Sequence, residues 1–265
     1  MDYLWYFYNR KNRFKMNHPY VKQSIEGQIA YIEFYHPSHN SLPGDILQKL
    51  VNLIESAGLN KEVKVIVLQS GGDRTFCAGA SFKELVNISD QHSGKIFFSG
   101  FAKVINAMRT CPKLIISRIQ GKTVGGGVGI IAASDYCLAT KHAEIKLSEL
   151  HLGIGPFVIG PVVERKIGLS SLSQISLNPT KFYSALWAKQ HGLYAEVFEN
   201  ISALDKSVRT FAEELCSYNQ DALKELKKSF WRGTDHWDTL LYEQAKISGE
   251  LVMSPFIKNK LSKFK

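Results

Sequence analysis

Two glycine-containing loops and one isolated carboxylate supply the residues that could do chemistry in this chain. The first loop lies within FCAGASFKEL, residues 76–85. Its small residues at 78–81 let main chain come close to a ligand, and the helix expected after them would direct free N–H groups toward that ligand. A tight turn is the simpler explanation of one such loop, so this segment alone decides nothing.

The second loop lies within QGKTVGGGVG, residues 120–129, and enters an apolar helical segment. Its three consecutive glycines, Gly125 to Gly127, leave no Cβ that could block a closely bound oxygen atom. The spacing does not fit G-x-x-x-x-G-K-[ST], which excludes a P-loop. No acidic residue stands where the ribose of a dinucleotide would need one, so a dinucleotide-binding unit fits poorly.

The third segment, KLSELHLGIGP at residues 146–156, contains a single acid, Glu149, among apolar neighbours. Burial disfavours the charged form of a carboxyl group and raises its pKa, which suits the group to move a proton near neutral pH. A buried capping or ion-paired glutamate is the alternative. His151 has no acidic or serine partner at a spacing that makes a triad, and Ser148 lacks the G-x-S-x-G setting of a nucleophile.

The elements that must position these residues follow an α/β pattern. Three β-branched or apolar segments predict strands: 28–35, 63–68 and 113–119. The repeated order of strand, glycine loop and helix indicates an α/β fold. The second of these strands is almost wholly apolar, so we expect it to be covered on both faces. A helix is predicted to open at Pro43 and to be closed by Gly58.

The C-terminal quarter has a different pattern, because the strand signal stops after about Ser202. Three helices are predicted there: 203–217, 219–232 and 235–253. Trp231 and Trp237 lie among these helical residues and are interpreted as packing or subunit-contact residues. Asp135, which follows the second glycine loop and its helix, is interpreted as structural.

Composition excludes several classes of protein. The chain has 265 residues, of which 45% are hydrophobic and 22% charged, which excludes a disordered, collagenous or fibrous chain. No apolar run approaches the roughly 18 residues of a transmembrane helix. The cysteines stand singly, without the spacing of a disulfide framework or a zinc site: Cys77, Cys111, Cys137 and Cys216. Reduced thiols and a cytoplasmic location are therefore expected, with no metal site.

The net charge of +9 favours an anionic partner such as nucleic acid, a membrane surface or a phosphorylated small molecule. Part of the excess is terminal: Arg10, Lys11, Arg13, Lys15, Lys258, Lys260, Lys263 and Lys265. Residues 1–15 lack the apolar core of a signal peptide. They are interpreted as an N-terminal arm, or as preceding a natural start at Met16. No RNA-recognition module is visible, which leaves RNA binding as a remote alternative.

The three chemical segments, in this order and spacing, resemble the enoyl-CoA hydratase (crotonase) superfamily. FCAGASFKEL and IQGKTVGGGVGIIAASDYCLA resemble its two oxyanion-hole motifs, and AEIKLSELHLGIGPFVIGPVVERKIG resembles the stretch with its catalytic acid. The resemblance runs from about Val21 to the C-terminus. It implies an α/β spiral of ββα turns over residues 16–202, carrying the active site. It also implies a helical region, 203–265, that assembles homotrimers or homohexamers and contacts coenzyme A.

The resemblance also assigns roles to single residues. The N–H groups of Ala80 and Gly126 would hold the thioester oxygen, with Glu149 as the catalytic acid. Two fixed donors at a developing enolate oxygen can each contribute a few kcal/mol. The residues assigned to substrate or coenzyme A are Ala78, Lys83, Gly129, Phe256 and Lys258. The family's C-terminal lysine aligns with Asn259, so Lys258 and Lys260 are assigned to the phosphates by proximity.

One departure bears on the reaction. Well-known hydratases of the superfamily use a second glutamate, and its position here is Gly129. Similar relatives with this pattern act on branched acyl-CoAs with a distal carboxylate, as in the hydration of methylglutaconyl-CoA in leucine degradation, or dehydrate hydroxymethylglutaryl thioesters. Members that isomerise a 3-enoyl-CoA also rely on one acid.

The leading prediction is therefore a lyase that adds or removes water at an α,β-unsaturated acyl-CoA, with no separate cofactor. A distal carboxylate on the substrate is predicted, because the missing acid would leave room for one. A Δ3-Δ2 enoyl-CoA isomerase is the alternative.

Overall fold

The computed structural model describes residues 18–262, and residues 1–15, with the predicted arm or start, lie outside this range. Three successive strand pairs organise the chain. The first strand of each pair joins a six-stranded sheet and the second joins a three-stranded sheet: β3 (Val65–Ser70) and β4 (Thr75–Cys77), β5 (Leu114–Ile119) and β6 (Lys122–Val124), β7 (Tyr136–Thr140) and β8 (Ile145–Lys146). Helices follow each pair, which confirms the predicted α/β spiral of ββα turns.

The large sheet has the order β1-β2-β3-β5-β7-β9. β1 (Tyr20–Glu26) pairs antiparallel with β2 (Ile29–Tyr35), and the other pairs, out to β9 (Glu196–Phe198), are parallel. The three strands predicted from sequence correspond to β2, β3 and β5. The strands of the small sheet were not predicted, because two or three residues are too few to show a periodic pattern.

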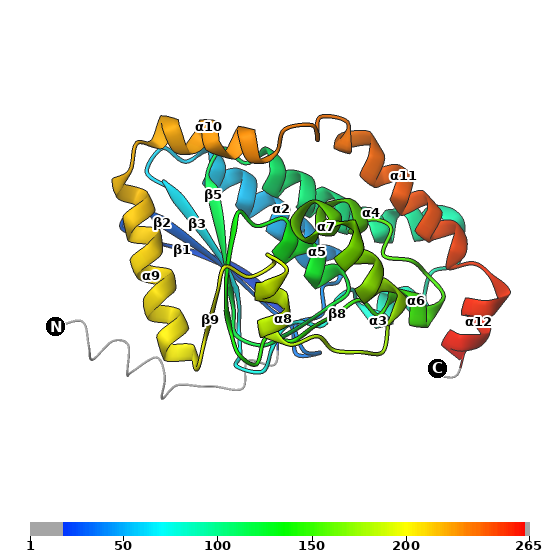
Figure 1. Ribbon diagram of the computed structural model, residues 1–265. Coiled ribbons are helices and arrows are strands. Elements are labelled where there is room, and N and C mark those ends of the chain that lie inside the picture. Colours follow the sequence, from blue (N-terminus) through cyan, green and yellow to red (C-terminus); the bar gives the residue numbers. More distant parts are fainter. Residues whose placement is uncertain (1–17, 263–265) are drawn as a thin grey trace.

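Helices cover the large sheet on both sides (Figure 1). On one side lie α2 (Gly44–Leu59), α4 (Gln91–Thr110), α5 (Gly126–Ala132) and α7 (Gly160–Leu177), and on the other lies α9 (Ile201–Ser217). Alternate residues of β3 enter the two cores: Val65 and Val67 pack in the cluster with α9, and Ile66 and Leu68 pack in the main cluster. The prediction that this strand is covered on both faces is therefore confirmed.

The predicted end of the first helix is wrong. α2 continues to Leu59, with Asn60 as its C-cap, and Gly58 lies inside it. A Cβ at residue 58 would lie 3.0 Å from Sγ of Cys111 and 3.2 Å from the ring of Pro112. Glycine at this position therefore allows close packing rather than a helix stop. Pro43 is the N-cap residue, so the helix begins at Gly44, one residue later than predicted.

The C-terminal helices are α9, α10 (Gln220–Phe230), α11 (Trp237–Leu251) and the unpredicted α12 (Pro255–Ser262). α11 crosses α4 so closely that a Cβ at Gly94 would lie 2.9 Å from Cα of Gly249. α12 packs beside α3 (Phe82–Val86) and α6 (Glu149–Leu152) in one apolar cluster. The Nζ of Lys260 on α12 also donates a hydrogen bond to the carbonyl of His151.

A buried ion pair fastens α10 to the sheet. Nζ of Lys227 lies 2.9 Å from Oδ2 of Asp135, and the two side chains are 3% and 4% exposed. The same Oδ2 accepts a hydrogen bond from the N–H of Ile115, and Oδ1 accepts one from Nε1 of Trp231. The ring of Trp231 packs edge-on against that of Trp237. These contacts support the interpretation of Asp135 and both tryptophans as packing residues.

Within residues 18–262, no helix has the length and apolar character needed to cross a membrane. The assembly of trimers by the C-terminal helices and the division at residue 202 stay predictions.

Candidate active site

The three chemical segments leave the carboxyl ends of neighbouring parallel strands. The small sheet has the order β4-β6-β8, and each strand is followed by one of these segments. The N–H of Gly125, after β6, donates to the carbonyl of Lys146 at the end of β8, with an N···O distance of 2.9 Å. Parallel pairing therefore brings together main chain at Ala80 and Gly126 and the side chain of Glu149, which are far apart in the sequence.

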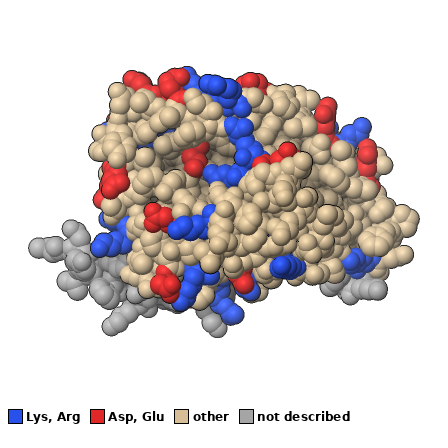
Figure 2. Space-filling view, in the orientation of Figure 1, with Lys and Arg blue, Asp and Glu red and all other residues tan. Residues whose placement is uncertain are grey.

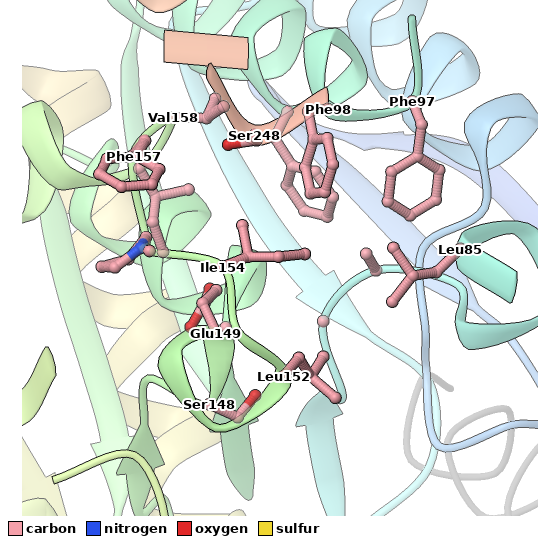
Figure 3. Close-up of a pocket in the computed structure, with 18 of the residues that line it drawn as sticks. Leu85, Phe97, Phe98, Ser148, Glu149, Leu152, Ile154, Phe157, Val158 and Ser248 are labelled. Carbon is pink, nitrogen blue, oxygen red and sulfur yellow. The ribbon is translucent and has the colours of Figure 1, made fainter. Parts of the chain in front are cut away.

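These segments enclose a cavity of about 200 Å³. Its wall is almost entirely apolar, and Glu149 is the sole ionisable residue among the described residues that line it. Three phenylalanines from one face of α4 contribute to the wall: Phe97, Phe98 and Phe101. Figure 3 shows the Glu149 side chain on the side of Ile154 and Phe157, with Phe97 and Leu85 on the opposite side.

The two glycine loops touch through their main chains. Gly79 has a φ of 89°, and a Cβ at this residue would lie 3.0 Å from the carbonyl oxygen of Val124 and 3.8 Å from N of Gly126. Only glycine combines this conformation with such a close approach. Ala80 follows directly, and both Ala80 and Gly126 line the cavity.

The N–H groups of Ala80 and Gly126 are candidate donors for a ligand. Gly126 is the first residue of α5, so its N–H has no partner within the helix. None of the main-chain hydrogen bonds among the described loops uses the N–H of Ala80 or of Gly126. Two fixed donors therefore lie on one wall of the cavity.

The carboxyl group of Glu149 lies against the second glycine loop. Gly125 has a φ of 55°, and a Cβ there would lie 3.1 Å from Oε1 of Glu149. Although the residue as a whole is half-buried, Oε2 is shielded from solvent and has no hydrogen-bond partner. Burial raises the pKa of this carboxyl to about 7, and main-chain N–H groups of Glu149 and Ser148 oppose the rise only in part. A proton can therefore be gained or lost here near neutral pH.

The position of the missing second acid is filled by an apolar side chain. Gly129 is buried and does not line the cavity. A Cβ there would lie 2.4 Å from Cγ2 of Ile159, which does line the cavity. Ile159 therefore occupies the space next to Gly129, and a substrate with a distal carboxylate stays a prediction.

Of the other residues assigned to substrate or coenzyme A, Ala78 lines the cavity, whereas Lys83, Phe256 and Lys258 lie outside it. Lys83 is exposed on α3, between Phe82 and Leu85, which line the cavity. Phe256 on α12 is 64% exposed. Its ring packs against the backbone at Gly153, where an added Cβ would lie 2.7 Å from Cδ1 of Phe256. Lys258 is exposed on the same helix. α3 and α12 share one apolar cluster beside the cavity, so these residues are arranged along its rim.

Several residues of the site were not predicted. Phe101 packs directly on the second glycine loop, because a Cβ at Gly126 would lie 2.2 Å from its Cε1. The spacing of the three phenylalanines of α4 is helical and could have been detected. Ser248 of α11 and Ile159 lie in the lining only because distant elements meet, so no local signal predicts them.

Other candidate groups are set aside by their surroundings. The four cysteines are free and buried, and burial raises the pKa of the Cys77 thiol to about 12. His151 is exposed. No group of three or more potential metal ligands exists within residues 18–262.

The charge excess is also smaller within residues 18–262 than in the whole chain. Six of the 33 basic and one of the 24 acidic residues lie outside 18–262, so that range carries +4 rather than +9. On the face shown in Figure 2, basic and acidic groups are interspersed. This distribution does not resemble the continuous basic surface of a nucleic-acid-binding protein.

Comparison with known proteins identifies the class to which this fold and site belong. The family model described as enoyl-CoA hydratase/isomerase matches residues 24–263. The chain therefore belongs to the enoyl-CoA hydratase/isomerase family and is an enzyme of the crotonase superfamily.

Individual relatives differ in the reaction they are named for. The chain is 28% identical over 209 residues to a peroxisomal Delta(3,5)-Delta(2,4)-dienoyl-CoA isomerase of Arabidopsis thaliana, covering 73% of each. It is 30% identical over 171 residues to human mitochondrial methylglutaconyl-CoA hydratase, covering 64% of this chain and 50% of that one. The fold is similar to that of an enoyl-CoA hydratase from Bacillus halodurans, with a TM-score of 0.84, 22% identity, and coverage of 92% of this chain and 99% of that one.

Proposed function

We propose that this enzyme adds water to, or removes it from, an α,β-unsaturated acyl-CoA, with Glu149 as its single acid–base group. The observation that carries the proposal is the shielded Oε2 of Glu149, which has no partner and lies beside the glycine loops. The N–H groups of Ala80 and Gly126 would donate hydrogen bonds to the thioester oxygen. Removing one such donor typically costs about 10²–10³ in turnover.

One carboxyl group can serve both proton transfers of a hydration. As the water oxygen attacks C3, the Glu149 carboxylate takes a proton from that water, and negative charge moves to the thioester oxygen. The enolate then collapses as Glu149 returns the proton to C2. Dehydration is the reverse. A pKa of about 7 supports both half-steps near neutral pH, since neither protonation state is strongly favoured.

The cavity wall supports an apolar acyl group. Among the described lining residues no Lys, Arg or His could neutralise a distal carboxylate. Because Ile159 fills the room beside Gly129, the argument that led to a carboxylated substrate loses its basis. An apolar chain is therefore our proposal, and methylglutaconyl-CoA, a substrate of leucine degradation, is the alternative for the test below.

The Δ3-Δ2 isomerase is the second candidate, and Ile159 favours it. An isomerase moves a proton from C2 to C4 of a 3-enoyl-CoA and needs no water. In this cavity, no second carboxylate can hold a water opposite Glu149, because Ile159 packs over the backbone at Gly129. The Glu149 carboxyl would take the proton from C2 and return it to C4, with the enolate again held by the two N–H groups.

The test is a substrate panel with identified products, on the unmodified enzyme and on Glu149→Gln. The panel contains crotonyl-, methylglutaconyl-, hydroxymethylglutaryl- and 3-hexenoyl-CoA. Hydration of crotonyl-CoA with the highest kcat/KM supports the lyase with an apolar substrate. A higher kcat/KM for methylglutaconyl-CoA restores the carboxylated substrate, and turnover of 3-hexenoyl-CoA alone assigns the isomerase. If Glu149→Gln remains fully active on the preferred substrate, the proposed mechanism fails.

The remaining assignments are parts of the same proposal. A homotrimer or homohexamer is expected from the family resemblance, and coenzyme A enters as part of the substrate rather than as a separate cofactor. A cytoplasmic location stays a prediction from the unpaired cysteines. RNA binding remains a remote alternative, and a nuclease-treated binding assay at increasing salt would detect it.

A further inference from the structure

The loop between β2 and α2 contains two consecutive residues with unusual backbone. His39 has a φ of 53° and Asn40 a φ of 57°, and they are the only non-glycine residues with positive φ within 18–262. Asparagine and histidine are among the few non-glycine residues found in this conformation, which is otherwise disfavoured by steric clash. Surrounding contacts must hold such a pair in place. The contacts made by Asn40 show what those are.

The Asn40 side chain is 3% exposed and makes hydrogen bonds in three directions. Its Nδ2 donates to the carbonyls of Gly71 and Thr75, with N···O distances of 2.8 Å for both. Its Oδ1 accepts from the N–H of His36 at 3.0 Å. Gly71 follows β3 and Thr75 opens β4. Asn40 therefore joins its own loop to both ends of the turn between β3 and β4, and the first glycine loop follows directly after β4.

The main chain of the same loop holds the glycine loop directly. The N–H of Ala78 donates to the carbonyl of His39 at 3.1 Å, and the N–H of Leu42 donates to the carbonyl of Gly79 at 2.8 Å. Leu42 also forms an isolated parallel bridge with Ala80. These contacts lie on both sides of Asn40 in the chain.

The bond from Leu42 fixes the direction of a neighbouring N–H. The carbonyl of Gly79 and the N–H of Ala80 belong to one planar peptide unit, and in a trans peptide they point in opposite directions. While Leu42 holds the Gly79 carbonyl, the Ala80 N–H must point the other way. Glycine at residue 79 places little steric restriction on rotation of this unit, so the restraint has to come from outside the glycine loop.

We propose that Asn40 is a positioning residue that keeps the Gly79–Ala80 peptide from rotating, so that the Ala80 N–H stays aimed at the substrate oxygen. The inference rests on the proposed role of Ala80 as an oxyanion donor. Asn40 touches neither the substrate nor the cavity. It acts by fixing the loop whose Leu42 N–H and His39 carbonyl clamp the glycine loop.

The main test is Asn40→Gly, which tolerates the left-handed backbone but removes all three side-chain bonds. We expect kcat to fall at least about 10-fold while KM changes little, since one oxyanion donor is worth about 10²–10³ when removed outright. Binding of acetoacetyl-CoA, whose enolate places charge on the thioester oxygen, should weaken in proportion to kcat. Binding of butyryl-CoA, which forms no such enolate, should not change.

Asn219→Ala is the matched control. Asn219 caps α10 through hydrogen bonds to the N–H groups of Asp221 and Ala222, so the variant loses side-chain bonds far from the glycine loops. It should lose stability and keep both kcat and enolate binding. Asn40→Asp keeps the shape of Asn40 and the bond from His36, and it replaces Asn40→Gly if that variant does not fold.

Two results overturn the inference. One is a folded Asn40 variant with normal kcat and normal enolate binding, and the other is failure of both variants to fold, which assigns Asn40 to folding alone. Glu149→Gln is measured in parallel. If Glu149→Gln is inactive while Asn40→Gly is fully active, only the positioning role fails. If Glu149→Gln is active, the proposed function itself fails.

Discussion

Two buried carboxyl groups in this molecule have opposite surroundings. Oδ2 of Asp135 lies 2.9 Å from Nζ of Lys227 and accepts a hydrogen bond from the N–H of Ile115, and Oδ1 accepts one from Trp231. Oε2 of Glu149 is equally shielded from solvent and has no partner. Both acids were noted in the sequence, yet only their surroundings separate their roles.

The difference shows how the same chemical group can serve stability or chemistry. A buried carboxylate with a cation and hydrogen bonds forms part of the packing, and removing one partner leaves an uncompensated charge. Burial raises the pKa of a carboxyl group that has an unpartnered oxygen, and a carboxyl with a pKa near neutral can exchange protons with a ligand. Asp135 therefore joins the C-terminal helices to the sheet, while Glu149 is available to a substrate in the cavity.

The largest expected effect is on turnover, at Glu149. Glu149→Gln preserves shape and removes the exchangeable proton, so we expect kcat to fall by about 10²–10⁴, the usual range for general acid–base catalysis. The fold should be retained, because Oε2 makes no hydrogen bond that the substitution could break. Steady-state kinetics with circular dichroism and thermal unfolding measure both properties. Loss of the fold together with activity would place Glu149 with Asp135 as a structural residue.

The second prediction concerns Asp135, where we expect a loss of stability with little loss of activity. Asp135→Asn leaves Lys227 charged and buried without its counter-ion, which should cost about 3–5 kcal/mol of unfolding free energy. Activity per folded molecule should remain within about two-fold, since Asp135 does not line the cavity. Urea unfolding monitored beside kcat separates these effects. The double variant Asp135→Asn, Lys227→Met should recover part of the loss, because it buries no unpaired charge.

A third prediction uses the pH dependence of stability to compare the groups. The pKa of Glu149 is raised from 4.5 to about 7 in the folded protein, so folding favours its protonated form. Its contribution to stability is therefore fully present below about pH 4.5, falls as pH rises toward 7, and is lost above that. At 1.36 kcal/mol per unit, the change is on the order of 3 kcal/mol.

The measurement is the unfolding free energy of the unmodified protein and of Glu149→Gln between pH 5 and pH 8. Gln does not titrate, so the difference between the two proteins isolates Glu149 from all other groups. The variant should gain stability relative to the unmodified protein as pH rises across this window. A difference that stays constant with pH would mean that Glu149 keeps an ordinary pKa and is not isolated from water.

The sequence predicted most of what local pattern can encode. β2, β3 and β5 and the helices α2, α9, α10 and α11 have enough apolar periodicity to be recognised, and the glycine loops identified the main chain that meets at the cavity. The short strands β4, β6 and β8 carry too few residues for a pattern, although their parallel pairing is what brings Glu149 to the second glycine loop.

The rest of the site depends on contacts between elements far apart in the chain. That Ile159 would fill the space at Gly129 could not be predicted, because 30 residues separate them and no local feature links them. The polar role of Asn40 was missed for a related reason. Its partners Gly71 and Thr75 lie beyond a full helix and strand, and its left-handed backbone is visible only in the structure.

The smallest expected effect concerns Lys83, whose exposed charge contrasts with the two buried carboxyl groups. Lys83 is exposed, so water would screen any interaction with a coenzyme A phosphate, and exposed ion pairs contribute about 0–1 kcal/mol. Lys83→Ala should therefore raise KM by up to about five-fold at low salt and leave kcat unchanged. The increase in KM should shrink at high salt.

The matched control is Lys61→Ala, which should leave KM unchanged. Lys61 lies in the exposed turn before β3, at the opposite ends of the strands from the cavity. Equal behaviour of the two variants at both salt concentrations would remove Lys83 from the coenzyme A site.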